Sequence, residues 1–173
     1  MNTLAFSVFY KDIMDPIEFI SFDLNGTRTV VQPINFRTGN LRGFEFEGRT
    51  SLGFAADWLE GLTIGGNYTQ LDSEVDVLEE VGFGLDEETR QLQGQPADLL
   101  NAFITYDNGP LGISSGVFFN RTGETLLTGA AAGDNGTPSV YERPISFLNF
   151  TFSKRLKQYE RGALSFGFKA KNI

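Results

Sequence analysis

Seven segments of the chain alternate apolar and polar residues with a period of two. This alternation sends successive side chains to opposite faces of an extended strand. No helical periodicity of useful length lies between the segments, so the chain is predicted to be all-β. The predicted strands are Leu4–Lys11, Asn35–Phe54, Leu62–Leu71, Leu99–Asp107, Leu111–Asn120, Ile145–Leu156 and Ala163–Asn172.

The connections between these strands alternate in length. Three are short, at Ala55–Gly61, Asn108–Pro110 and Lys157–Gly162. Three are long, at about Asp12–Pro33, Asp72–Pro96 and Arg121–Pro144. In an antiparallel up-and-down meander, every short turn then lies at one end of the sheet and every long loop at the other. Transmembrane β-barrels show this asymmetry, so the segments are predicted to form part of the wall of a large barrel.

The two faces of the predicted strands differ in polarity. Phe44 and Phe46 alternate with Glu45 and Glu47, and Arg49 follows on the glutamate side. We expect the phenylalanine face to contact lipid and the other face, rich in Gly, Ser, Thr and Asn, to line a hydrated lumen. The lumen-facing candidates are Glu45, Glu47, Arg49, Asn67 and Asn149.

Two alternative classes of protein fit the same alternation. One is a small outer-membrane barrel with a structural or adhesive role, and the other is a soluble carbohydrate-binding β-sandwich whose core the phenylalanines cover.

Composition argues against catalysis. The 173 residues contain no cysteine and no histidine, which removes thiol nucleophiles, thiolate metal sites and the commonest general base. No G-x-S-x-G nucleophile motif is present either. We therefore predict a protein that is not an enzyme and has no cofactor, metal or catalytic residues. The net charge of −8, with no basic patch, predicts no nucleic-acid partner.

One segment carries the whole net charge, because the rest of the chain has equal numbers of acidic and basic residues. We expect this segment to be an extracellular loop. Its carboxylates bind calcium or capture a ligand in one interpretation, and keep a solvated loop from aggregating in the other. The spacing does not match the EF-hand pattern. The acidic residues are Asp72, Glu74, Asp76, Glu79, Glu80, Asp86, Glu87 and Glu88.

Six stretches of the chain share an order and spacing with a known family: "SVFYKDIMDPIEFI", "NLRGFEFEGRTSL", "GGNYTQLDSEV", "LQGQPADLLNAFITYDN", "GVFFNRTGETL" and "VYERPISFLNFTFSKRL". With them, the chain resembles the C-terminal part of the β-barrel of TonB-dependent outer-membrane receptors. A seventh stretch, "LSFGFKAKNI", resembles the ending of the penultimate strand in that family. The resemblance implies a 22-stranded barrel plugged by an N-terminal globular domain. It also implies energised uptake of a scarce ligand such as an iron chelate, cobalamin or a glycan.

The resemblance also implies what surrounds the chain. Residues 1–173 are expected to be a C-terminal β-barrel fragment that lacks the plug domain and the last strand. Seven strands cannot close a barrel without leaving unpaired edges in lipid. The expected partners are outer-membrane lipid, the protein's own plug domain, TonB and an imported small-molecule ligand. The expected location is the outer membrane of a Gram-negative bacterium.

Overall fold

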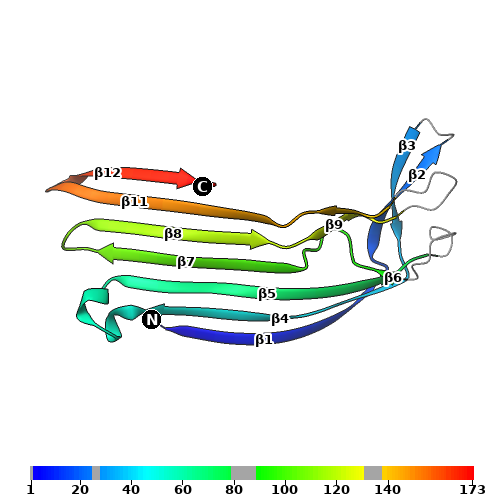
Figure 1. Cartoon of the computed structure of the whole chain (residues 1–173), viewed down its shortest axis with the longest axis horizontal. Helices are drawn as coiled ribbons and strands as arrows, with labels where there is room; N and C mark the ends of the chain where they lie inside the picture. Colours follow the sequence, from blue (N-terminus) through cyan, green and yellow to red (C-terminus); the bar gives the residue numbers. More distant parts are fainter. Residues whose placement is uncertain (1, 25–27, 79–88, 131–137) are drawn as a thin grey trace.

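The computed structural model describes residues 2–24, 28–78, 89–130 and 138–173. Its main sheet is antiparallel throughout, and seven of its strands follow one another in the order β1-β4-β5-β7-β8-β11-β12 (Figure 1). We call these seven strands the wall. They are β1 (Thr3–Met14), β4 (Thr38–Ser51), β5 (Leu62–Asp76), β7 (Asp98–Asn108), β8 (Ile113–Thr122), β11 (Ile145–Tyr159) and β12 (Gly162–Lys171).

The remaining elements lie at the two ends of the wall (Figure 1). At the short-turn end, the 3-10 helices η1 (Leu52–Phe54) and η2 (Asp57–Leu59) connect β4 to β5. At the long-loop end, the strand β6 (Thr89–Arg90) pairs with the last residues of β5. Two separate hairpins complete the fold: β2 (Ile17–Leu24) with β3 (Arg28–Asn35), and β9 (Thr125–Thr128) with β10 (Val140–Glu142).

The predicted all-β, antiparallel meander is confirmed, and each of the seven predicted strands corresponds to one strand of the wall. The connections also have the predicted asymmetry. The β2–β3 and β9–β10 hairpins were not predicted and lie inside the long connections. Within the described residues, no helix is long and apolar enough to cross a membrane.

Several boundaries differ from the sequence prediction: β1 runs to Met14 and β11 to Tyr159, and Leu52–Phe54 form a 3-10 helix. The end of β5 corrects the predicted acidic loop. Strand β5 continues beyond Leu71 to Asp76, so Asp72, Glu74 and Asp76 lie in a strand and not in a loop. The extension pairs with β4 as far as the Gly39–Val75 pair, and then with β6. Val75 is fully buried there, which stabilises the extended conformation by packing. The other predicted loop acids, Glu79, Glu80, Asp86, Glu87 and Glu88, lie outside the described residues.

The strand register gives the wall two distinct faces. Phe6, Phe46, Tyr68 and Leu100 are successive partners across four strands, and we call their side the apolar face. Phe150 and Phe168 belong to the same face and lie 6.1 Å apart between ring centroids. The opposite side is the polar face. It carries the residues that alternate along each strand with those of the apolar face, for example Glu47 and Asn67. The predicted separation of Phe44, Phe46 and Phe150 from Glu45, Asn67 and Asn149 is therefore present in the structure.

Burial is concentrated at the long-loop end of the molecule. The fully buried apolar side chains among the described residues are Phe36, Val75 and Leu126. The apolar face of the wall is uncovered, and Leu4, Phe6 and Val8 on β1 are 77%, 66% and 72% exposed. Within the described residues, no second sheet packs against the wall (Figure 1). A β-sandwich core of the kind considered from the sequence is therefore not found in this part of the chain.

Candidate functional site

A row of amide side chains crosses the middle of the polar face. Glu47 on β4, Asn67 on β5, Asn101 on β7 and Asn120 on β8 are successive cross-strand partners. Asn101 Nδ2 donates to Asn67 Oδ1 at 2.7 Å, and Asn120 Nδ2 donates to Asn101 Oδ1 at 2.5 Å. We call Asn67, Asn101 and Asn120 the amide row. Such cross-strand pairs stabilise the sheet and also leave polar atoms free to bind another surface.

An aromatic and basic row lies next to the amide row on the same face. Arg49 lies over the ring of Phe103, with its Cζ 6.0 Å from the ring centroid, and the Phe103 and Phe118 centroids are 6.4 Å apart. Gly65 lies beneath Phe103, and a Cβ at position 65 would come within 2.6 Å of that ring. A larger residue at position 65 would therefore displace the ring. This row offers a guanidinium and two aromatic faces for binding.

The five predicted lumen-facing residues all lie on the polar face. Glu45, Glu47 and Arg49 follow one another on β4, and Glu47 is the direct partner of Asn67. Asn149 lies four strands away from β4, where Asn149 Oδ1 accepts a hydrogen bond from the Asn172 backbone amide at 3.3 Å. The structure therefore brings Glu47 and Asn67 together and leaves Asn149 apart from them.

Other residues of this face were not singled out from the sequence. Asn101 and Asn120 complete the amide row, and Phe103 and Phe118 form the aromatic pair. Their positions in the alternation give the correct face. Their alignment across strands depends on register, which the alternation alone does not supply.

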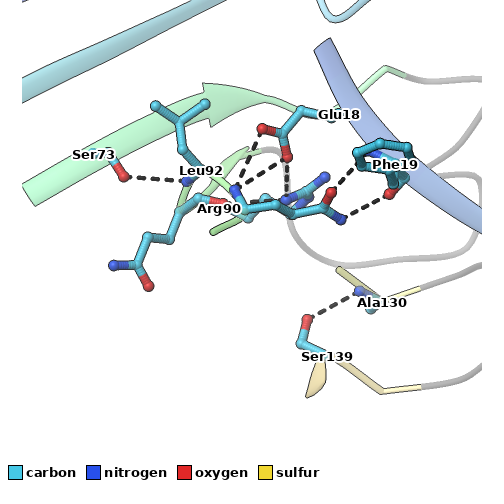
Figure 2. Close-up of polar contacts among 9 residues, drawn as sticks. Glu18, Phe19, Ser73, Arg90, Leu92, Ala130 and Ser139 are labelled. Atoms are coloured by element: carbon cyan, nitrogen blue, oxygen red, sulfur yellow. Dashed lines mark hydrogen bonds and ion pairs between the residues drawn. The ribbon is translucent and has the colours of Figure 1, made fainter. Parts of the chain in front are cut away.

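A second cluster of side chains lies at the long-loop end, and Figure 2 shows its polar contacts. Arg90 Nη1 lies 2.7 Å from Glu18 Oε2, and these side chains are only 8% and 3% exposed. The Arg90 Cζ also lies 5.2 Å from the ring centroid of Phe36. We call Glu18, Phe36, Val75, Arg90 and Leu126 the loop-end cluster. No sequence prediction identified it, because its members come from the end of β5 and from connections that are far apart in the chain.

Comparison with known proteins identifies the family. The family model described as "TonB dependent receptor-like, beta-barrel" matches residues 1–173. The chain belongs to this family. A solved structure of a mutant ferric enterobactin receptor (PfeA) from Pseudomonas aeruginosa is similar to the chain, with a TM-score of 0.59 and 16% sequence identity. The similarity covers 98% of this chain and 23% of that receptor. The comparison with curated proteins found no match.

Membership of the TonB-dependent receptor-like family bears on several sequence predictions. The predicted family is confirmed, and proteins of this family are receptors and not enzymes. Proteins of the family are outer-membrane receptors and transporters of Gram-negative bacteria. The match therefore favours a receptor barrel over a small structural or adhesive barrel. At this level of identity, the solved structure supports the fold alone and says nothing about this chain's ligand.

The acidic residues of the predicted extracellular loop divide into two groups. Asp72, Glu74 and Asp76 lie on β5, with Asp72 accepting from Arg42 at 2.6 Å and Asp76 accepting from the Thr38 hydroxyl. Both members of the Arg42–Asp72 pair are exposed, so the pair contributes little to stability. Within the described ranges, no three acidic side chains are grouped closely enough to hold a metal ion. The remaining five acids lie outside those ranges.

Proposed function

We propose that residues 1–173 form part of the C-terminal barrel wall of an outer-membrane TonB-dependent receptor. This receptor imports a scarce ligand, namely an iron chelate, cobalamin or a glycan. The observation that best supports the proposal is the two-faced wall, with an uncovered apolar face on one side and a row of amides and charges on the other. Once such a wall is completed into a closed barrel, all backbone polar groups of its strands pair between neighbouring strands, as a bilayer requires.

The apolar face has the boundaries expected of a lipid-facing surface. Towards the long-loop end it carries the ion pairs Arg42–Asp72 and Arg121–Asp98. Towards the short-turn end, Lys154 on β11 donates to the Leu111 carbonyl. Charged groups at both margins, with phenylalanine and isoleucine between them, match the apolar band of outer-membrane barrels. Three exposed aromatic residues lie at or beside the short turns, as in an interfacial girdle: Phe54, Trp58 and Tyr159.

The polar face fits the lumen, where it would contact the plug domain. Glu45 and Glu47 on β4 are acidic, and Lys169 and Lys171 on β12 are basic. None of these four side chains has an ion-pair partner within the described residues. A plug surface with basic groups opposite β4 and acidic groups opposite β12 would complement this distribution.

The long-loop end would face the outside of the cell, where a scarce ligand first meets the receptor. The acidic residues Asp72, Glu74 and Asp76 extend towards this end on β5. Outer-membrane barrels have short periplasmic turns and longer extracellular loops, which fixes this orientation in the proposal.

Uptake by the full-length protein tests this function. The protein would be produced in a Gram-negative host, and accumulation of radiolabelled iron chelates, cobalamin and glycans would be compared with and without TonB. We expect the protein to fractionate with the outer membrane and one ligand class to accumulate only when TonB is present. Recovery in the soluble fraction, or uptake that is unchanged without TonB, would contradict the proposal.

A further inference from the structure

Arg90 contacts all three long connections of the chain. Arg90 itself lies in β6, which is part of the second connection. Its guanidinium forms an ion pair with Glu18 of β2, in the first connection, at 2.7 Å. The ring of Phe36, just after β3, lies 5.2 Å from the Arg90 Cζ. In the third connection, Gly129 lies so close that a Cβ there would be 2.6 Å from Arg90 Nε. One side chain therefore joins segments that are far apart in sequence.

Gln93 strengthens the link between the first two connections. Its side chain accepts from the Phe19 backbone amide at 2.8 Å and donates to the Phe19 carbonyl at 2.7 Å. These are the same two hydrogen bonds, one accepted and one donated, that the backbone of a residue in an adjacent antiparallel strand would make with Phe19. The Gln93 backbone amide also donates to the Glu18 carboxylate, at 3.3 Å from Oε1.

The third connection is fixed to the second by backbone bonds. Gly94 N donates to the Leu126 carbonyl at 2.8 Å, and Ala97 N donates to the Glu124 carbonyl at 2.9 Å. Pro96 and Thr125 form an isolated β-bridge between these two bonds. The side chain of Leu126 is fully buried at this junction. Residues 94–97 are therefore paired with residues 124–126.

Burial makes the Glu18–Arg90 pair different from the other ion pairs. At 3% and 8% exposure, neither group can replace its partner with bulk water unless the segments separate. Removal of one partner from such a pair leaves an uncompensated buried charge, which is strongly destabilising. The Arg42–Asp72 pair, with side chains 65% and 61% exposed, carries no such penalty.

We propose that Glu18 and Arg90 couple the β2–β3 hairpin, segment 89–97 and segment 123–130 into one body at the long-loop end of the wall. A displacement of any one of these three segments then displaces the other two. A molecule that contacts one connection therefore changes the position of all three. The coupling is independent of the identity of the imported ligand and of TonB, so it is measured without transport.

Hydrogen exchange of the full-length protein, followed by mass spectrometry, tests the coupling. Glu18→Gln removes the buried negative charge, keeps the size of the side chain and leaves the Arg90 guanidinium uncompensated. Asp72→Asn is the matched control at an exposed pair. We expect Glu18→Gln to speed exchange by about tenfold or more in all three segments together. The wall strands, and all segments of Asp72→Asn, should exchange as in the wild type.

A second variant perturbs the Glu18–Arg90 pair by a substitution in the third connection. Gly129→Ala changes no polar group but places a methyl group against Arg90. We expect it to speed exchange in the same three segments, including the β2–β3 hairpin. Faster exchange confined to residues 123–130 would overturn the proposal. So would faster exchange in Glu18→Gln that is confined to the β2–β3 hairpin.

The wild-type protein gives an independent measurement in case both variants fail to assemble. Exchange in increasing urea should show the three segments losing protection at one common urea concentration, below that at which the wall loses it. Loss of protection at clearly different urea concentrations for the three segments would show that they open separately, and would refute the coupling.

Discussion

Asn101 occupies the centre of the amide row on the polar face, where it donates to Asn67 and accepts from Asn120. Asn101→Ala removes both bonds, whereas Asn120→Ala removes one. Because these side chains are only half-buried, water replaces part of what is lost, and we expect a cost of about 1 kcal/mol for Asn101→Ala. The midpoint of urea unfolding of the full-length protein should fall further for Asn101→Ala than for Asn120→Ala. Midpoints of both variants equal to that of the wild type would show that the row contributes nothing to the wall.

Phe46 and Glu47 are neighbours on β4 that point to opposite faces of the wall. An arginine at a lipid-facing position near the bilayer centre costs about 2–4 kcal/mol. We therefore expect Phe46→Arg to reduce assembly of the full-length barrel much more than Glu47→Arg does. Heat-modifiability on gels measures the assembled fraction. Equal assembly of the two variants would count against a lipid-facing position for Phe46.

At the scale of single elements, the extension of β5 makes a clear prediction. Residues Asp72–Asp76 pair with β4 and β6, so their ladder amides should exchange as slowly as those of the preceding strand residues. Hydrogen exchange of the full-length protein measures this directly. If the amides of Asp72–Asp76 exchange within seconds, as those of an open loop do, the strand does not extend as described.

The wall elements were predictable from the sequence because their signal is local. Each strand alternates between an apolar and a polar surface, so the period of two is visible without knowledge of neighbouring strands. The end of β5 was placed too early, since Asp72 and Glu74 were interpreted as loop residues. The period of two continues there with inverted phase, because Ser73 and Val75 are buried on the side of Asn67 and the acids lie on the side of Tyr68.

The loop-end cluster was not predictable by the same reasoning. Phe36 falls at the start of a predicted strand and Leu126 in a long connection, and the local sequence does not indicate that either side chain is fully buried. Glu18 and Arg90 become a pair only when β2 and β6 meet. The members of the polar face were predictable by strand phase, but the hydrogen bonds of the amide row require the register of three strands.

At the scale of the whole molecule, the wall exposes apolar surface and open edges. Phe6, Phe44 and Phe46 are 66%, 37% and 45% exposed, and the outer edges of β1 and β12 have no partner among the described residues. Unpaired strand edges of this kind promote aggregation. We therefore predict that residues 1–173 expressed alone form inclusion bodies and show no uptake. A soluble, cooperatively melting monomer in detergent-free buffer, by analytical ultracentrifugation and calorimetry, would be inconsistent with a barrel wall.

The two-faced wall is tested most directly by spin labels placed one at a time along β4 of the full-length protein in lipid. The structure places Phe44, Phe46, Gly48 and Thr50 on the apolar face and Glu45, Glu47 and Arg49 on the polar face. Accessibility to oxygen, which partitions into lipid, should therefore be high at the first set and low at the second. Accessibility that does not alternate along β4, or that alternates with the opposite phase, would contradict a wall with lipid on its phenylalanine side.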